Sequence, residues 1–176
     1  IDISKVWPDG SDEITALAVH NGFLIIFGKR QILIYQGAED PATMSISDTI
    51  IGVGCIARDS VQVTGVDLIF LSDSGVRSLQ RTIQEKSAPM RDISKNIRTE
   101  LTTYIQSETL NIFSAYSPEE AFYLLHLPTT NITYCFDMRA PLQDGAHRTT
   151  QWDTISPQAL CRTRAGNLLL GKPVGI

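Results

Sequence analysis

Residues 16–35 have the sequence ALAVHNGFLIIFGKRQILIY, in which three short apolar runs are separated by two polar turns. The first turn contains Asn21-Gly22, the pair that most strongly favours a tight two-residue hairpin, because both residues accept positive φ. The runs are rich in Ile and Phe, which are enriched in strands. The stretch therefore predicts an antiparallel meander of three strands.

The same order of strand, turn, very apolar strand, polar turn and strand recurs along the chain. Aligning the central strands at Phe23, Asp67, Ala121 and Asn167 gives steps of 44, 54 and 46 residues. Small antiparallel sheets repeated every 40–50 residues or so are typical of a β-propeller, in which each blade needs a neighbour on either face. We therefore predict an all-β fold of propeller blades in one domain, with an ordinary β-sandwich as the alternative.

The predicted blade-like units lie at about residues 14–37, 56–80, 112–137 and 155–176. The last unit is partial, and a closed propeller needs at least about four blades. We therefore expect the 176-residue chain to be a fragment of a larger propeller protein that completes the ring.

One helix is predicted as an insertion at about residues 91–105, because apolar residues recur there at every fourth position. This stripe contains Ile93, Ile97 and Leu101. The helix either lies over the side or rim of the propeller or presents its stripe to another subunit. Trp152 is expected to pack between blades, so these four residues are the candidate subunit or interblade contacts.

Composition excludes several classes of protein. Hydrophobic residues make up 43% of the chain, which excludes a disordered, highly charged protein. No apolar run approaches the ~18 residues of a membrane span, so none is expected. The net charge of -4 disfavours a protein that coats nucleic acid. The cysteines Cys55, Cys135 and Cys161 fit no disulfide framework and no zinc motif, so they are expected to be free, small apolar side chains.

The sequence contains no motif of a catalytic or metal site. The three histidines lack metal-binding spacing, and no serine lies in a nucleophile elbow. A propeller hydrolase or lyase could use a pair of carboxylates, and the candidate pairs are Glu39 with Asp73 and Asp137 with Asp153. However, Asp73 and Asp137 lie in or beside turns, where Asp commonly forms hydrogen bonds to the backbone. We therefore predict that the chain has no catalytic residue, metal or cofactor and that it is not an enzyme.

Three stretches carry a resemblance to a known family: residues 20–37, residues 51–79, and Tyr134–Arg139 followed by a loop and Trp152. In each, a strongly apolar strand is followed by a short turn and an exit strand. Over residues 14–171 the chain resembles the tail nozzle proteins of short-tailed phages (podoviruses). These are also called tail tubular protein B, and they are related to the packaged-DNA stabilisation proteins.

The resemblance implies a structural virion protein made in the host cytoplasm and located in the phage tail. It implies a homo-oligomeric ring, a hexamer, that lies below the portal and adaptor and meets the tail fibres or needle. Genomic DNA would pass through its channel during DNA ejection without sequence specificity, and a mildly acidic chain suits such sliding because it binds phosphates weakly. The alternatives are a cellular β-propeller scaffold for protein interactions and a propeller polysaccharide hydrolase or lyase.

Overall fold

The computed structural model describes residues 5–85, 92–155 and 157–172. The chain divides into two compact units: Ile1–Asp73 with Arg77–Met90, and Ser74–Val76 with Arg91–Ile176. Within the described residues, no helix is both long and apolar enough to cross a membrane.

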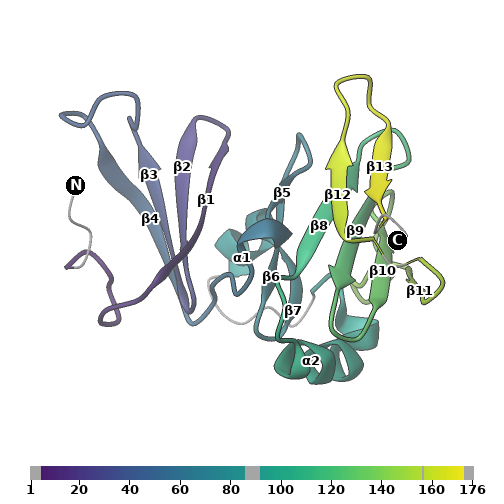
Figure 1. Cartoon of the computed structure of the whole chain (residues 1–176). Helices are drawn as coiled ribbons and strands as arrows, with labels where there is room; N and C mark the ends of the chain where they lie inside the picture. Colours follow the sequence, from purple (N-terminus) through teal and green to yellow (C-terminus); the bar gives the residue numbers. More distant parts are fainter. Residues whose placement is uncertain (1–4, 86–91, 156, 173–176) are drawn as a thin grey trace. The chain divides into compact units, whose positions relative to one another are not determined.

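The first unit begins with a four-stranded antiparallel meander, drawn in purple and blue in Figure 1. Its strands are β1 (Ile14–His20), β2 (Phe23–Gly28), β3 (Gln31–Gln36) and β4 (Ser45–Ile51), hydrogen-bonded in that order. Asn21 and Gly22 both have positive φ, 51° and 79°, as a tight hairpin between β1 and β2 requires. The two residues therefore set the register in which His20 pairs with Phe23.

A smaller sheet and a short helix follow in the chain. The 3-10 helix η1 (Arg58–Ser60) precedes β5 (Gln62–Val63), β6 (Leu68–Ser72) and β7 (Gly75–Ser78), which form a three-stranded sheet. Helix α1 (Leu79–Glu85) starts directly after β7. Apolar side chains of β6 and α1 pack against one face of the first meander, where the rings of Phe27 and Phe70 lie 5.0 Å apart.

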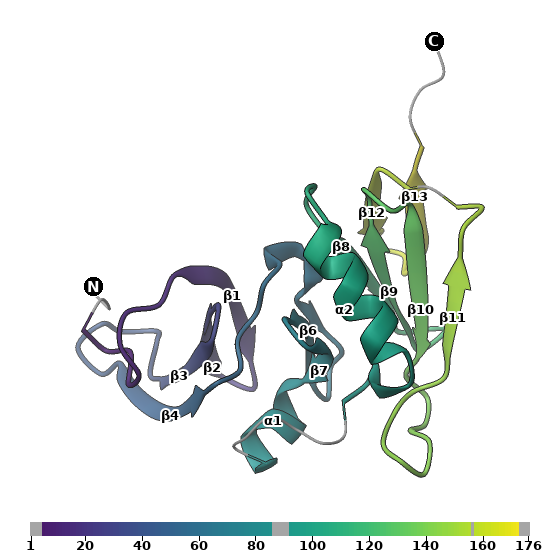
Figure 2. The same ribbon diagram turned by 90° about the horizontal axis from the view of Figure 1, so that it is seen from below.

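The second unit contains the 3-10 helix η2 (Lys95–Ile97), helix α2 (Arg98–Ser107) and a second meander. The meander consists of β8 (Phe113–Ser117), β9 (Phe122–Leu127), β10 (Ile132–Asp137) and β11 (Thr149–Trp152), in the order β11-β10-β9-β8. Among the described strands, β12 (Ala159–Arg162) and β13 (Leu168–Gly171) form a separate two-stranded sheet. Helix α2 lies beside the second meander (Figure 2), and the Tyr134 hydroxyl on β10 donates a hydrogen bond of 2.9 Å to Glu100 on α2.

The predicted fold class is confirmed: the chain is mostly strands in several antiparallel sheets, with a helical segment inserted between them. The two four-stranded meanders have the up-and-down topology of a propeller blade. Closure into a ring stays a prediction.

Some boundaries differ from the sequence analysis. The first sheet has a fourth strand, β4, beyond the predicted limit at residue 37. The inserted α-helix spans Arg98–Ser107 rather than 91–105, because residues 93–94 form a turn and η2 precedes α2. Arg91 lies outside the described residues. Helix α1 was not predicted: it begins at Leu79, inside the predicted blade-like unit of residues 56–80.

Candidate functional site

A pocket of about 290 Å³ lies in the first unit. Its walls come from the β1–β2 turn, from β2, β3 and β4, from the turn before β6, and from α1. The lining residues are His20, Asn21, Phe23, Ile25, Ile34, Ser47, Asp48, Val66, Asp67, Leu79, Gln80 and Ile83. The size is just below the range of about 300–1,000 Å³ typical of small-ligand sites, and it suits a side chain better than a large cofactor.

The register of the first meander explains why an acidic group adjoins an apolar floor. Ala18, Ile25, Ile34 and Asp48 pair in one row across β1, β2, β3 and β4. Residues that pair across strands project to the same face of a sheet. Ile25 and Ile34 therefore form the buried floor, and the row ends in the half-buried carboxylate of Asp48.

Asp67 is held on the opposite wall by a set of hydrogen bonds. Its Oδ1 accepts from the backbone N–H groups of Leu68 (2.7 Å) and Gln80 (3.0 Å), and its Oδ2 accepts from the Ser78 hydroxyl. Because Gln80 lies in the first turn of α1, the carboxylate caps this helix from 13 residues upstream. Its position is therefore fixed before any ligand arrives.

Among the described residues that line the pocket, the charged side chains are the carboxylates of Asp48 and Asp67. Ile25, Ile34 and Leu79 are buried in its floor. The arrangement is suited to an apolar side chain that lies next to a positive charge.

The candidate contact residues predicted from the sequence lie elsewhere, in the second unit. Ile93 and Leu101 are buried, whereas Ile97 and Trp152 are half-buried. Trp152 ends β11 and pairs with Thr133 on β10. That these residues contact other blades or subunits stays a prediction.

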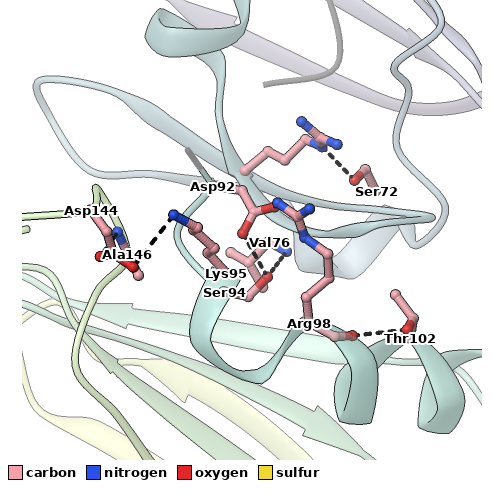
Figure 3. A network of polar contacts seen from close by, with 10 residues as sticks. Ser72, Val76, Asp92, Ser94, Lys95, Arg98, Thr102, Asp144 and Ala146 are labelled. Atoms are coloured by element: carbon pink, nitrogen blue, oxygen red, sulfur yellow. Dashed lines mark hydrogen bonds and ion pairs between the residues drawn. The ribbon is translucent and has the colours of Figure 1, made fainter. Parts of the chain in front are cut away.

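A polar network fixes the start of α2 (Figure 3). The buried Asp92 carboxylate forms an ion pair with Arg98 and accepts a hydrogen bond of 3.4 Å from the Ser94 hydroxyl. Ser94 Oγ in turn accepts from the backbone N–H of Val76 at 2.9 Å. In the same unit Lys95 Nζ lies 3.5 Å from the Asp144 carboxylate. The network anchors the segment that carries Ile93, so its role is structural.

The candidate carboxylate pairs do not gain a catalytic arrangement. Asp137 receives two hydrogen bonds from the Arg139 guanidinium, 2.9 Å from Nε and 2.6 Å from Nη2, and these hold the pKa of the carboxyl far below its usual range. Asp137 is therefore ionised and cannot act as a general acid near neutral pH. Asp73 and Glu39 are exposed on separate turns of the first unit, and Asp153 is exposed after β11.

The structure gives His126, near the end of β9, a core environment. The ring is buried beside Phe113, with centroids 5.0 Å apart, and its Nδ1 is hydrogen-bonded to Thr133 Oγ1 at 2.8 Å. Burial lowers the pKa of His126, and the nearby Glu108 carboxylate opposes part of this effect. Across the described ranges, His, Cys, Asp and Glu side chains form no group of three or more that could hold a metal ion.

The sequence analysis did not identify the pocket. Its members come from six separate segments, and Asp67 is recognisable as a helix cap only once the fold brings it to Gln80. The sequence contains only a weak signal for the pocket, namely that Asp48 and Asp67 lie in or next to apolar strands.

Comparisons with known proteins identify no family. No family model matches the chain, and no curated protein matches it. Among solved structures, it is similar to one described as "AfRom2 CNH domain", with 12% sequence identity and a TM-score of 0.46. The match covers 93% of this chain and 50% of the other, so the chain spans about half the length of that structure. A likeness of this degree assigns no function.

Proposed function

We propose that this chain is part of the tail nozzle of a short-tailed phage, a structural component of the ring through which the genome leaves the virion. The observation that carries the proposal is that the first meander is apolar on both faces. The location in a phage tail is inferred from the resemblance of the sequence to the tail nozzle proteins.

One face of this sheet is covered within the first unit. It contributes residues such as Ile25, Phe27 and Ile32 to a core shared with β6 and α1. The second face has rows of apolar side chains too, since Leu17 pairs with Ile26 and Val19 pairs with Leu24.

The second face is covered only in part. Trp7 packs on Ile26 and its neighbours Leu33 and Tyr35. Leu17 and Val19, on the edge strand β1, remain 61% and 67% exposed. In a propeller both faces of a blade pack against neighbours, so this exposed strip is a surface that a partner subunit could cover. A sheet that needs partners on both faces suits an assembled scaffold.

The finer features of the proposal come from the resemblance. They are six copies in a ring, contacts with the adaptor and with tail fibres or needle, and passage of DNA without sequence recognition. The net charge of -4 is consistent with a channel that binds phosphates weakly.

The test is to locate the full-length gene product. Purified phage particles are analysed by quantitative mass spectrometry, with the portal as the internal standard for copy number. We expect about six copies per particle, and particles assembled without the protein should lose packaged DNA. Absence from the particles would overturn the proposal, and a protein bound to cellular partners would favour the scaffold alternative.

A variant of the exposed strip separates assembly from folding. Leu17→Asp should reduce incorporation into particles while the protein remains folded, because Leu17 is exposed. Thr99→Asp, at an exposed position of α2, is the matched control and should be incorporated normally.

A further inference from the structure

Residues 5–13, which contain no strand or helix, form a strap that lies against the second face of the first meander. Trp7, which is 7% exposed, packs there on Ile26, Leu33 and Tyr35 of β2 and β3. The strap continues directly into β1. The first sheet is therefore preceded by a short segment that binds it through an aromatic anchor.

Two polar side chains fix the strap to the meander. Gln31 on β3 is 3% exposed; its Nε2 donates to the Gly10 carbonyl at 3.2 Å, and its Oε1 accepts from the Asp9 N–H at 3.0 Å. The Asp12 carboxylate accepts from two backbone N–H groups of the β2–β3 turn, at 3.1 and 2.9 Å. Because each of these bonds joins a side chain to backbone, the strap can leave without breaking the backbone ladder of the sheet.

The strap leaves the β1 side of the same face bare. Leu17 pairs with Ile26 and Val19 pairs with Leu24, so both side chains of β1 project to the face on which Trp7 lies. Both remain largely exposed, and β1 is an edge of its sheet. Native proteins usually cover or interrupt such edges. A second copy that approaches this edge would bury the two apolar side chains.

We propose that the strap is exchanged between copies, so that residues 5–13 of one copy bind the first meander of its neighbour in the assembled protein. Every copy has the same binding site, so the contacts made within one chain are made again between chains. Exchange of an identical element is a low-cost route to association for this reason. The gain is the burial of Leu17 and Val19 between the copies.

The start of β1 provides the hinge. The pairing of β1 with β2 shifts its register between Ile14 and Ala16, and Ile14 is 47% exposed. An irregularity of this kind bends a strand, so the strap can be directed to another copy while β1 stays paired with β2. The exchange rests on the proposed ring and deepens it, because each copy gives one strap and receives one. Such a heterologous contact produces a ring when the rotation between copies closes.

A zero-length cross-link reads the position of the strap in the unmodified protein. Glu13, at the end of the strap, forms an exposed ion pair of 2.7 Å with Lys29 of the meander. A water-soluble carbodiimide activates the carboxylate, and the amine then forms an amide with release of a urea. Unlabelled and heavy-isotope-labelled copies of the full-length gene product are mixed before assembly, oligomers are isolated, and cross-linked peptides are identified by mass spectrometry.

In the oligomers, we expect about half of the links between Glu13 and Lys29 to join a labelled copy to an unlabelled one. The ion pair of Lys95 with Asp144 in the second unit, at 3.5 Å, is the internal control. Its links should join peptides of the same isotope, because the exchange does not involve this pair.

The variant Trp7→Ala separates a strap that bridges copies from one that only covers its own sheet. Loss of a bridge should lower the oligomer fraction several-fold at fixed concentration, whereas loss of a cover would expose the apolar face and raise that fraction. Ser11→Ala, at an exposed position of the strap, is the matched control and should assemble normally. The cross-link is read in the unmodified protein, so the test does not depend on the folding of Trp7→Ala.

The outcomes separate this inference from the proposed function. Oligomers in which the links between Glu13 and Lys29 are isotopically pure would overturn the exchange and leave the nozzle proposal standing. Oligomers without this link would also overturn the exchange, because the strap would then have left the meander. Mixed links in an oligomer that is absent from phage particles would support the exchange and contradict the nozzle. A protein that stays monomeric with its adaptor would contradict both.

Discussion

Replacing Leu101 by Ala tests whether the α2 stripe belongs to the core of the second unit. Leu101 is 0% exposed, so the substitution removes apolar surface that is entirely withdrawn from water. Ile93 of the same stripe is buried as well. The structure therefore predicts a loss of folding stability rather than a loss of assembly alone.

The size of the loss follows from the burial. Leu→Ala removes three carbon atoms, and each buried methylene contributes about 0.8 kcal/mol, giving about 2.4 kcal/mol before any cavity is counted. The remaining cavity adds to this, because cores relax only in part, and measured Leu→Ala losses in cores are about 2–5 kcal/mol. We expect the free energy of unfolding to fall by about 3 kcal/mol.

The assay is urea unfolding followed by far-UV circular dichroism. With an m value of about 1–3 kcal/mol per molar urea, the midpoint should fall by about 1 M or more. Gln106→Ala, at an exposed position of the same helix, is the control and should shift the midpoint little. An unchanged midpoint in Leu101→Ala, together with weaker oligomers, would refute the core assignment and show that the stripe contacts another subunit.

Three further predictions address other parts of the chain. Burial keeps the pKa of His126 below its usual value near 6.5, so on acidification the unfolded state takes up a proton that the folded state does not. The free energy of unfolding should therefore decrease as the pH is lowered from 7.5 to 5.5. His126→Phe should flatten this decline in urea titrations. Asp67→Ala removes this cap of α1 and should cost about 1 kcal/mol in the same titrations, and an unchanged or increased stability would contradict the capping role. Gly54→Ala would place a Cβ 2.3 Å from the Gly28 carbonyl oxygen, so it should unfold the first unit or leave it insoluble, and a normal melting curve would count against this packing.

The strands could be predicted where local signals agree with the fold. Residues 23–27 are apolar, follow a hairpin pair and lie in β2, and β10 ends at Asp137, the predicted end of the unit at residues 112–137. Strand β4 was missed because its sequence, SISDTII, mixes polar with apolar residues. Such an edge strand is defined by its pairing with β3, which a local pattern does not contain.

Helices and the pocket depend on contacts between distant residues. Helix α1 begins directly after β7, and two side chains accept hydrogen bonds from its first backbone N–H groups: Ser78 from Arg81 and Asp67 from Gln80. A single serine before Leu79 is too weak a local signal to predict the helix, and Asp67 is distant in the sequence. The start of α2 is set by the ion pair between Asp92 and Arg98 and by the bond of Ser94 to Val76. The periodicity of the stripe indicated the helix, but it could not indicate that its first turns are replaced by η2.

The most direct test of the account is native mass spectrometry of the full-length gene product at neutral pH and moderate salt. If the proposal of a nozzle ring is correct, a sheet that needs a neighbour on both faces predicts a closed oligomer of six copies. A stable monomer, under conditions in which the protein is folded and the adaptor is supplied, would contradict the claim that this chain is built to assemble into a ring.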